Sequence, residues 1–259
     1  MKKFPLPIIY IFFIILFLIS PISAHAEDVE KLKQKHINNL KAETADEYIS
    51  NAETKSLFGY NDKAILDINK AIELEPNNAK AYSERGNIKV EIGNDKLLKG
   101  DQNGAGKAYK DSLLDYDKAI ELLNQNLKLN PKNAEGYFLR GEIKYKSGRQ
   151  RDLLGKDNTS ITNYIGALED FSKVIELEPN NAKAYSERGM TKFKLGDYVG
   201  EIKDFNKVIE LEPDNAYAYV QRGIGKVMLG EKIAGCKDLS KAGEMGHNSA
   251  YNVMSDLCK

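Results

Sequence analysis

Two charged residue types recur at fixed places along the sequence and could support acid–base chemistry. The aspartates are Asp67, Asp115, Asp170, Asp204 and Asp238, and the arginines are Arg85, Arg140, Arg188 and Arg222. An enzyme that works with paired carboxylates places them once, in one cleft. Because these acids recur, we expect Arg–Asp ion pairs that link helices, either within a hairpin or between neighbouring hairpins. Asn51 occupies the first arginine place, so one aspartate should lack a partner.

The other candidates for chemistry are two histidines and one glycine-rich stretch. After residue 26 the histidines are His36 and His247, and neither has the spacing of a metal site or lies beside a nucleophile motif. The stretch GDQNGAGK (Gly100–Lys107) is unlike a phosphate-binding loop, because five residues separate its outer glycines and Ala108 replaces the hydroxyl residue. The sequence therefore predicts no catalytic, cofactor-binding or metal-binding site, and a protein that is not an enzyme.

The amino terminus has the pattern of a secretory signal peptide. Lys2 and Lys3 precede the apolar run Ile8–Ile19, and small residues lead up to Ala26. We predict a signal peptide over residues 1–26, cleavage after Ala26, and export to the periplasm or the extracellular space. The alternative is a retained anchor, but the run is shorter than the roughly 20 apolar residues that span a bilayer.

The charges of the chain exclude some partners. The whole sequence has 38 basic and 38 acidic residues, and loss of Lys2 and Lys3 would leave a net charge of −2. An evenly spread charge of this size offers no footprint for nucleic acid or an anionic membrane. We expect no nucleic-acid partner and no membrane span after removal of the signal.

Two cysteines, Cys236 and Cys258, lie near the carboxyl end. In an oxidising compartment such an isolated pair favours a disulfide. By the chain-entropy argument this bond would contribute on the order of 3 kcal/mol. The alternative is two free, buried thiols.

The sequence repeats itself at a definite period. The stretch IELEPNNAKAYSERG occurs at Ile72–Gly86 and again at Ile175–Gly189, and a unit of 34 residues runs from Ala182 to Asn215. The same frame places five repeats at 45–78, 79–133, 134–181, 182–215 and 216–246. A lead-in segment (27–44) precedes them and a last segment (247–259) follows.

Each repeat carries an aromatic residue, a small residue and a turn glycine at constant places. The aromatics are Tyr48, Tyr82, Tyr137, Tyr185 and Tyr219, the small residues Ala52, Gly86, Gly141, Gly189 and Gly223, and the turn glycines Gly59, Gly93, Gly148, Gly196 and Gly230. This pattern resembles the tetratricopeptide repeat (TPR). The resemblance implies an all-α, right-handed superhelical solenoid of stacked helical hairpins, in which the small residue lets the second helix approach closely.

The second and third repeats are longer than the others. Each has 14 extra residues after its turn glycine, and the second has another 7 before Pro131. Two interpretations stay open. The insertions either lengthen both helices of a hairpin by about two turns, with tips near Gly100–Gly106 and Gly155–Ser160, or form loops on the surface.

The last segment predicts a capping helix. Its apolar residues Ala250, Val253, Met254 and Leu257 follow helical spacing. Exported members of the TPR family often have a similar ending with two cysteines, so the resemblance also implies a bond between Cys236 and Cys258.

The TPR resemblance implies a protein or peptide partner bound by the first helices of the hairpins, which line a concave groove. The candidate groove residues are Phe138, Tyr145, Met190, Phe193, Tyr217, Val220 and Ile224. Self-contact remains an alternative use of this surface, through a homo-oligomer or through residues 27–43 folding back. A second hypothesis is a structural or assembly component of an envelope complex that uses the long hairpins.

Overall fold

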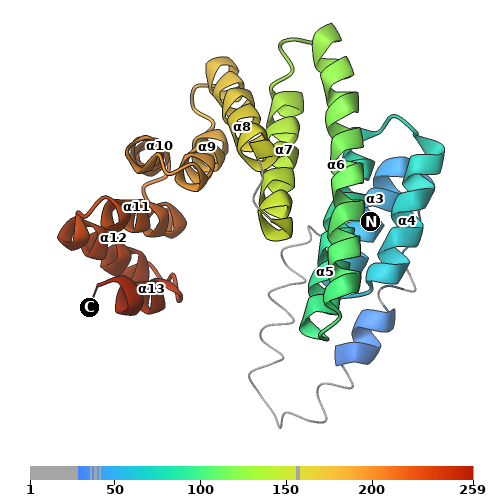
Figure 1. Cartoon of the computed structure of the whole chain (residues 1–259), viewed down its shortest axis with the longest axis horizontal. Helices are drawn as coiled ribbons and strands as arrows, with labels where there is room; N and C mark the ends of the chain where they lie inside the picture. The colour runs from blue at the N-terminus through green and yellow to red at the C-terminus, as the bar shows by residue number, and fades with distance from the viewer. Residues whose placement is uncertain (1–28, 36, 38–39, 41, 156–157, 259) are drawn as a thin grey trace, which may run out of the picture. The chain divides into compact units, whose positions relative to one another are not determined.

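The computed structural model describes residues 29–35, 37, 40, 42–155 and 158–258 (Figure 1). The predicted signal peptide and its cleavage site at Ala26 lie outside these residues. Over the described ranges the regular structure is entirely helical. The chain divides into two compact units, Met1–Leu74 and Glu75–Lys259.

The first unit contains one helical hairpin, made of α3 (Ala45–Leu57) and α4 (Asn61–Leu74). A capping box starts α3: the Thr44 hydroxyl accepts from the Glu47 amide, and the Glu47 carboxylate accepts from the Thr44 amide. Ile49 of α3 and Ile68 of α4 are fully buried in this hairpin.

Residues 29–35 are helical and contact the turn between α3 and α4. The Tyr60 hydroxyl donates to the Glu30 carboxylate, and the Lys33 ammonium lies 5.9 Å from the centre of the Phe58 ring. The described part of the lead-in segment therefore packs on the first hairpin.

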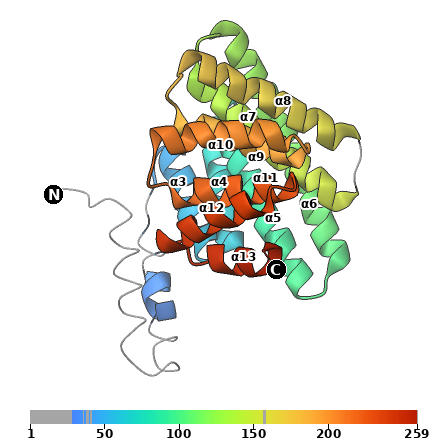
Figure 2. The same ribbon diagram turned by 90° about the vertical axis from the view of Figure 1, so that its left-hand side faces the viewer.

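The second unit is a succession of hairpins (Figure 2). Its helices are α5 (Ala79–Leu98), α6 (Gln102–Leu129), α7 (Ala134–Leu154), α8 (Asn158–Leu177), α9 (Ala182–Lys194), α10 (Tyr198–Leu211), α11 (Ala216–Met228), α12 (Lys232–Glu244) and α13 (Ala250–Leu257). Helices pack in the pairs α5–α6, α7–α8, α9–α10 and α11–α12, and each second helix also packs on the next first helix. This arrangement confirms the predicted all-α fold of stacked hairpins.

An asparagine begins every first helix of the second unit. The side-chain oxygens of Asn78, Asn133, Asn181 and Asn215 accept the backbone N–H three residues further on. Asparagine is among the best residues at this place because it satisfies an amide that has no partner within the helix. The recurrent Asn-Ala dipeptide of the sequence thus marks the start of each hairpin in the second unit.

In the hairpins of the second, third and fourth repeats, a glycine of the first helix meets an aromatic ring of the second. A methyl group on Gly189 would lie 3.0 Å from the Phe205 ring, and one on Gly86 would lie 2.6 Å from the Tyr116 ring. Both rings are almost fully buried. The expectation that the small residue permits close approach of the second helix is correct.

The insertions of the second and third repeats are helical. Helices α5 and α7 have 20 and 21 residues where α9 has 13, and α6 has 28 where α10 has 14. The chain reverses at Gly100 and Gly155, whose φ angles of 81° and 119° are left-handed. The structure therefore shows two long hairpins in place of surface loops.

Two of the predicted turn glycines do not lie in turns. Gly93 lies inside α5 and Gly148 inside α7, and a methyl group on Gly93 would overlap the Tyr109 ring. Tyr164 covers Gly148 in the same way. The assignment of these two glycines as turns is wrong. In the long hairpins they lie within the first helix and allow an aromatic ring of the second helix to pack closely against it.

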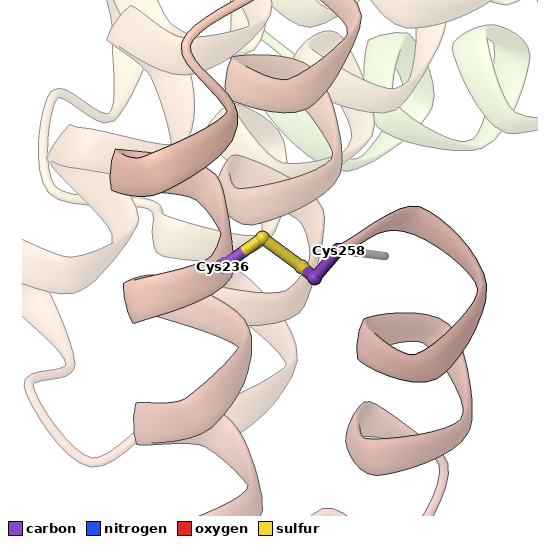
Figure 3. The surroundings of a disulfide bond; sticks show 2 residues. All are labelled: Cys236 and Cys258. Carbon is purple, nitrogen blue, oxygen red and sulfur yellow. A yellow bond between two sulfur atoms is a disulfide. The ribbon is translucent and has the colours of Figure 1, made fainter.

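Helix α13 covers the end of the second unit, and a disulfide between Cys236 and Cys258 fastens it to α12 (Figure 3). The two Cα atoms are 6.0 Å apart. Ala250 of α13 is fully buried against Leu239 and Ala242 of α12. The predicted cysteine pairing is confirmed. Within the described ranges, no helix has the length and apolar character needed to cross a membrane.

Candidate protein-interaction surface

The recurring aspartates form ion pairs inside the hairpins. The pairs between hairpin helices are Arg85–Asp115, Arg140–Asp170, Arg188–Asp204 and Arg222–Asp238, with N–O distances of 2.5 to 2.7 Å. In each pair the carboxylate also meets a lysine four residues after the arginine, namely Lys89, Lys144, Lys192 or Lys226. These charges join helices and are fully engaged, so they form a structural ladder and not a catalytic cleft.

The first repeat keeps the same contact without an arginine. Lys55 stands four residues after Asn51 and pairs with Asp67 at 2.5 Å. The expectation that one aspartate lacks a partner is therefore wrong. In this repeat Lys55 supplies the cation for the aspartate, because Asn51 stands where the other repeats have arginine.

Helix α9 contacts the first helices of both neighbouring hairpins, α7 and α11. These three helices bring together four predicted site residues, Phe138, Tyr145, Met190 and Tyr217, which we call the aromatic face. All four side chains are partly exposed, and Tyr217 is the most open at 40%. The Tyr217 hydroxyl lies 3.3 Å from the Met190 sulfur and joins α11 to α9.

Two of these rings continue into the core beneath the face. The ring of Phe138 lies 5.6 Å from that of Phe171, and the ring of Tyr145 lies 5.7 Å from that of Tyr164. Each exposed ring thus rests on a buried one from the second helix of the same hairpin. The aromatic face is therefore held rigidly, which limits the ordering cost of binding.

The remaining predicted groove residues are placed differently. Val220 is only 4% exposed and packs with Leu239, Ala242 and Ala250. It belongs to the core, and the expectation that it lines a partner surface is wrong because α12 and α13 enclose it. Ile224 is partly buried against the same core. Phe193 packs edge-on against Tyr198 of the next helix, at 5.4 Å between ring centres.

Charged residues border the aromatic face. Lys183 of α9 pairs with Glu142 of α7 at 3.2 Å, and its ammonium lies 4.3 Å from the centre of the Phe138 ring. Glu187, one helical turn further along α9, has no ion pair among the described residues. Burial raises the pKa of Glu187, and the nearby Glu142 raises it further, while Lys183 and Lys146 act in the opposite direction.

The two tyrosines of the face lie within the field of Glu187. Burial raises the pKa of Tyr217 to about 12, with further contributions from Glu187 and Tyr145. Burial also raises the pKa of Tyr145, where Glu187 adds to the shift and Arg149 opposes it. The charge of Glu187 therefore acts on both tyrosines of the face.

A second unusual acid, Glu201 of α10, lies against Gly225 of α11. It is fully buried, and neither carboxyl oxygen has a hydrogen-bond partner among the described residues. Burial raises its pKa to about 8, and Asp204 adds to the shift. Gly225 of α11 leaves the space that this side chain fills.

Glu201 could have been found by aligning the repeats. The equivalent places hold Ala64, Ser112, Ala167 and Gly235, all of them small. The sequence therefore shows that Glu201 is larger than its equivalents in the other repeats. That Gly225 makes room for it can be seen only in the packed structure. The described residues contain no group of three His, Cys, Asp or Glu side chains suited to hold a metal ion.

Comparisons with known proteins agree with this architecture. Residues 115–148 match a family model described as TPR repeat, and residues 182–215 match one described as tetratricopeptide repeat. No curated protein matches the sequence. The fold defines a protein of stacked helical hairpins, and these hairpins include tetratricopeptide repeats.

Solved structures show the same fold. TTC0263, described as a thermophilic TPR protein from Thermus thermophilus, aligns with a TM-score of 0.57 at 14% identity, over 83% of this chain and 98% of that one. MamA from Desulfovibrio magneticus RS-1 aligns with a TM-score of 0.50 at 16% identity, over 80% of this chain and 97% of that one. At these identities the likeness concerns the fold alone.

Proposed function

We propose that this chain is an exported, non-enzymatic scaffold that binds a protein partner, as an extended peptide or a helix, on the aromatic face. Its tetratricopeptide repeats support a protein–protein interaction role. The observation that carries the finer proposal is the joint presence of Phe138, Tyr145, Met190 and Tyr217 on three adjacent helices, partly exposed.

The chemistry of the face suits peptide recognition. Aromatic side chains supply large contact areas with few rotatable bonds, and tyrosine adds a hydroxyl for hydrogen bonding. Methionine adapts to partners of different shape. The ion-pair ladder engages the repeated charges elsewhere, so the side chains available to a partner on this face are mainly apolar.

Export is part of the proposal. The amino-terminal pattern supports it, and the disulfide is in keeping with an oxidising compartment. Expression of the full chain with fractionation of the cells, followed by amino-terminal sequencing, tests it directly. We expect a processed chain that begins at Glu27 in the envelope or the medium; an unprocessed chain in the cytoplasm would contradict export.

The binding proposal is tested by selecting short random peptides on the purified chain. The Tyr217→Ala/Met190→Ala variant should bind the selected peptides at least about tenfold more weakly, because truncated hot-spot residues often cost more than about 1 kcal/mol. Leu98→Ala/Leu153→Ala alters exposed residues far along the long hairpins and serves as the control. Equal binding by the wild type and the Tyr217→Ala/Met190→Ala variant would refute the aromatic face.

A second candidate function is assembly through the long hairpins. Leu98 is 87% exposed and Leu153 is 66% exposed, and both lie close to the hairpin turns at Gly100 and Gly155. Exposed leucines near two such turns favour contacts with another protein or another copy. Light scattering tests this role: a mass above the monomer that returns to the monomer in Leu98→Ala/Leu153→Ala would support it.

A further inference from the structure

We propose that Glu187, Tyr145 and Tyr217 form a recognition point for a lysine or arginine side chain of the partner peptide. This inference rests on the proposed function, because it names the partner chemistry that the aromatic face selects. Two observations support it: the different surroundings of Glu84 and Glu187, which occupy the same place in two identical stretches, and the charges around Glu187.

The three residues come from three different helices, α7, α9 and α11. Glu187 lies on α9, which contacts both α7, the helix of Tyr145, and α11, the helix of Tyr217. The charge of Glu187 contributes to the raised pKa of both tyrosines. Tyr217 is fixed toward α9 through the Met190 sulfur, and Tyr145 rests on Tyr164. An acidic group close to aromatic rings is an arrangement that attracts a cation through both charge and π-faces.

The fifteen-residue stretch that occurs twice contains a glutamate at the same place in both copies, Glu84 and Glu187. In the first copy the Asn87 side chain donates to the Glu84 carboxylate at 3.0 Å, across one helical turn. In the second copy the residue one turn after Glu187 is Met190, whose side chain has no N–H to donate. The first carboxylate is satisfied by its own helix and the second is not.

The cations near Glu187 are engaged or distant. Lys183 pairs with Glu142 and lies over Phe138. Lys146 acts on Glu187 only through its field, since no ion pair joins them among the described residues. Glu142 adds a second negative charge from α7; burial is the main cause that raises the pKa of Glu187, and Glu142 adds to it.

A basic side chain would complete this arrangement. Its ammonium or guanidinium would make a charge-assisted hydrogen bond to the Glu187 carboxylate and would contact the faces of Tyr145 and Tyr217. A partner carboxylate at the same place would meet Glu187 and Glu142 and be repelled. The face therefore discriminates by charge as well as by apolar contact.

The experiment uses the random peptides selected on the purified chain. For a peptide containing lysine, a second version carries norleucine in its place, and both are titrated against the wild type, Glu187→Gln and Glu84→Gln. The Glu84→Gln variant is the matched control, because the same change is made within the same local sequence. Thermal unfolding of each variant verifies that it is folded.

We expect the selected peptides to share a basic residue and to bind the wild type about tenfold or more above their norleucine versions, as charge-assisted hydrogen bonds contribute more than about 1.4 kcal/mol. Glu187→Gln should remove most of that difference, while Glu84→Gln should leave it unchanged. Binding to the wild type should also weaken as the salt concentration rises.

The outcomes separate this inference from the proposed function. If peptide binding is lost in Tyr217→Ala/Met190→Ala but the norleucine exchange has the same effect in the wild type and in Glu187→Gln, the aromatic face stands and the cation site falls. Selection of acidic peptides would overturn the cation site as well. If the Tyr217→Ala/Met190→Ala variant binds as the wild type does, both proposals fall.

Discussion

The Arg85 guanidinium donates hydrogen bonds to both carboxylate oxygens of Asp115, a residue 30 positions further along the chain. In the fourth repeat Arg188 makes the same contact with Asp204, although only 16 positions separate them. The additional residues therefore extend both helices beyond the ion pair and leave the pair itself in place. This explains how two repeats can be long without disturbing the stacking of their neighbours.

The ion-pair ladder predicts a large cost for removing one of its aspartates. Asp115→Ala leaves Arg85 and Lys89 without their buried anion and should lower the free energy of unfolding by about 3 kcal/mol. Urea denaturation measures the change. Asp117→Ala, which removes a more exposed pair with Arg151, should cost less than about 1 kcal/mol. Equal losses in the two variants would show that the ladder contributes no more than a surface pair.

Glu201 predicts a pH-dependent stability. Its ordinary pKa is 4.5 and its pKa in the folded protein is raised to about 8, so the folded state holds a proton that the unfolded state has released. The contribution of Glu201 is fully present below pH 4.5 and is lost as the pH rises to about 8. The slope should reach at most about 1.4 kcal/mol per pH unit.

A substitution isolates this contribution. Glu201→Met keeps the length of the side chain but cannot ionise, so its free energy of unfolding should exceed that of the wild type near pH 8 and match it more closely at about pH 5. Glu210→Gln, at an exposed place on the same helix, should keep the slope of the wild type. A wild-type slope that persists in Glu201→Met would assign the pH dependence to other groups.

The internal glycines of the long hairpins predict opposite effects of the same substitution. Gly93→Ala would place a methyl group against the Tyr109 ring and should destabilise the protein by about 1 to 3 kcal/mol. Gly106→Ala, inside α6 with no atom near the new methyl group, should stabilise it by about 0.5 to 1 kcal/mol. Thermal unfolding distinguishes the two, and a stabilised Gly93→Ala would contradict the close approach of the helices.

The disulfide predicts a measurable anchoring of α13. Cys258→Ser should lower the free energy of unfolding by about 3 kcal/mol, because the bond joins residues 22 positions apart. Reduction of the wild type should lower its melting temperature to that of the variant. If reducing agent left the melting temperature unchanged, the bond would be absent from the native protein.

Much of the fold could be predicted from the sequence because the recurring residues of the repeat act through contacts within one hairpin. Asparagine starts the first helices, glycine meets an aromatic ring, and Cys236 is bonded to Cys258. Each of these signals depends on a near neighbour or on a fixed place within one hairpin. The assignment of Gly93 failed for the same reason, since a turn and a close helix contact both require glycine.

The candidate site was less predictable because it depends on contacts between repeats. Val220 has the place of a surface residue within its own helix, yet α12 and α13 bury it. Glu84 and Glu187 lie in identical stretches, and their difference comes from Asn87 and Met190 just beyond them and from the helices beside them. The structure shows that Asn87 engages the Glu84 carboxylate, whereas the Glu187 carboxylate has no such bond among the described residues.

The Arg–Asp pairs keep a constant place in hairpins of different length. The 14 extra residues of the second and third repeats lie between the arginine and the aspartate of the pair, so they lengthen the hairpin on one side of it, where Arg151 of α7 still pairs with Asp117 of α6. Reach can therefore change in steps of whole helical turns while the ion pair keeps its place in the repeat. In this chain the second and third hairpins are longer variants of one adjustable module, and related chains could differ in reach while keeping the same foundation.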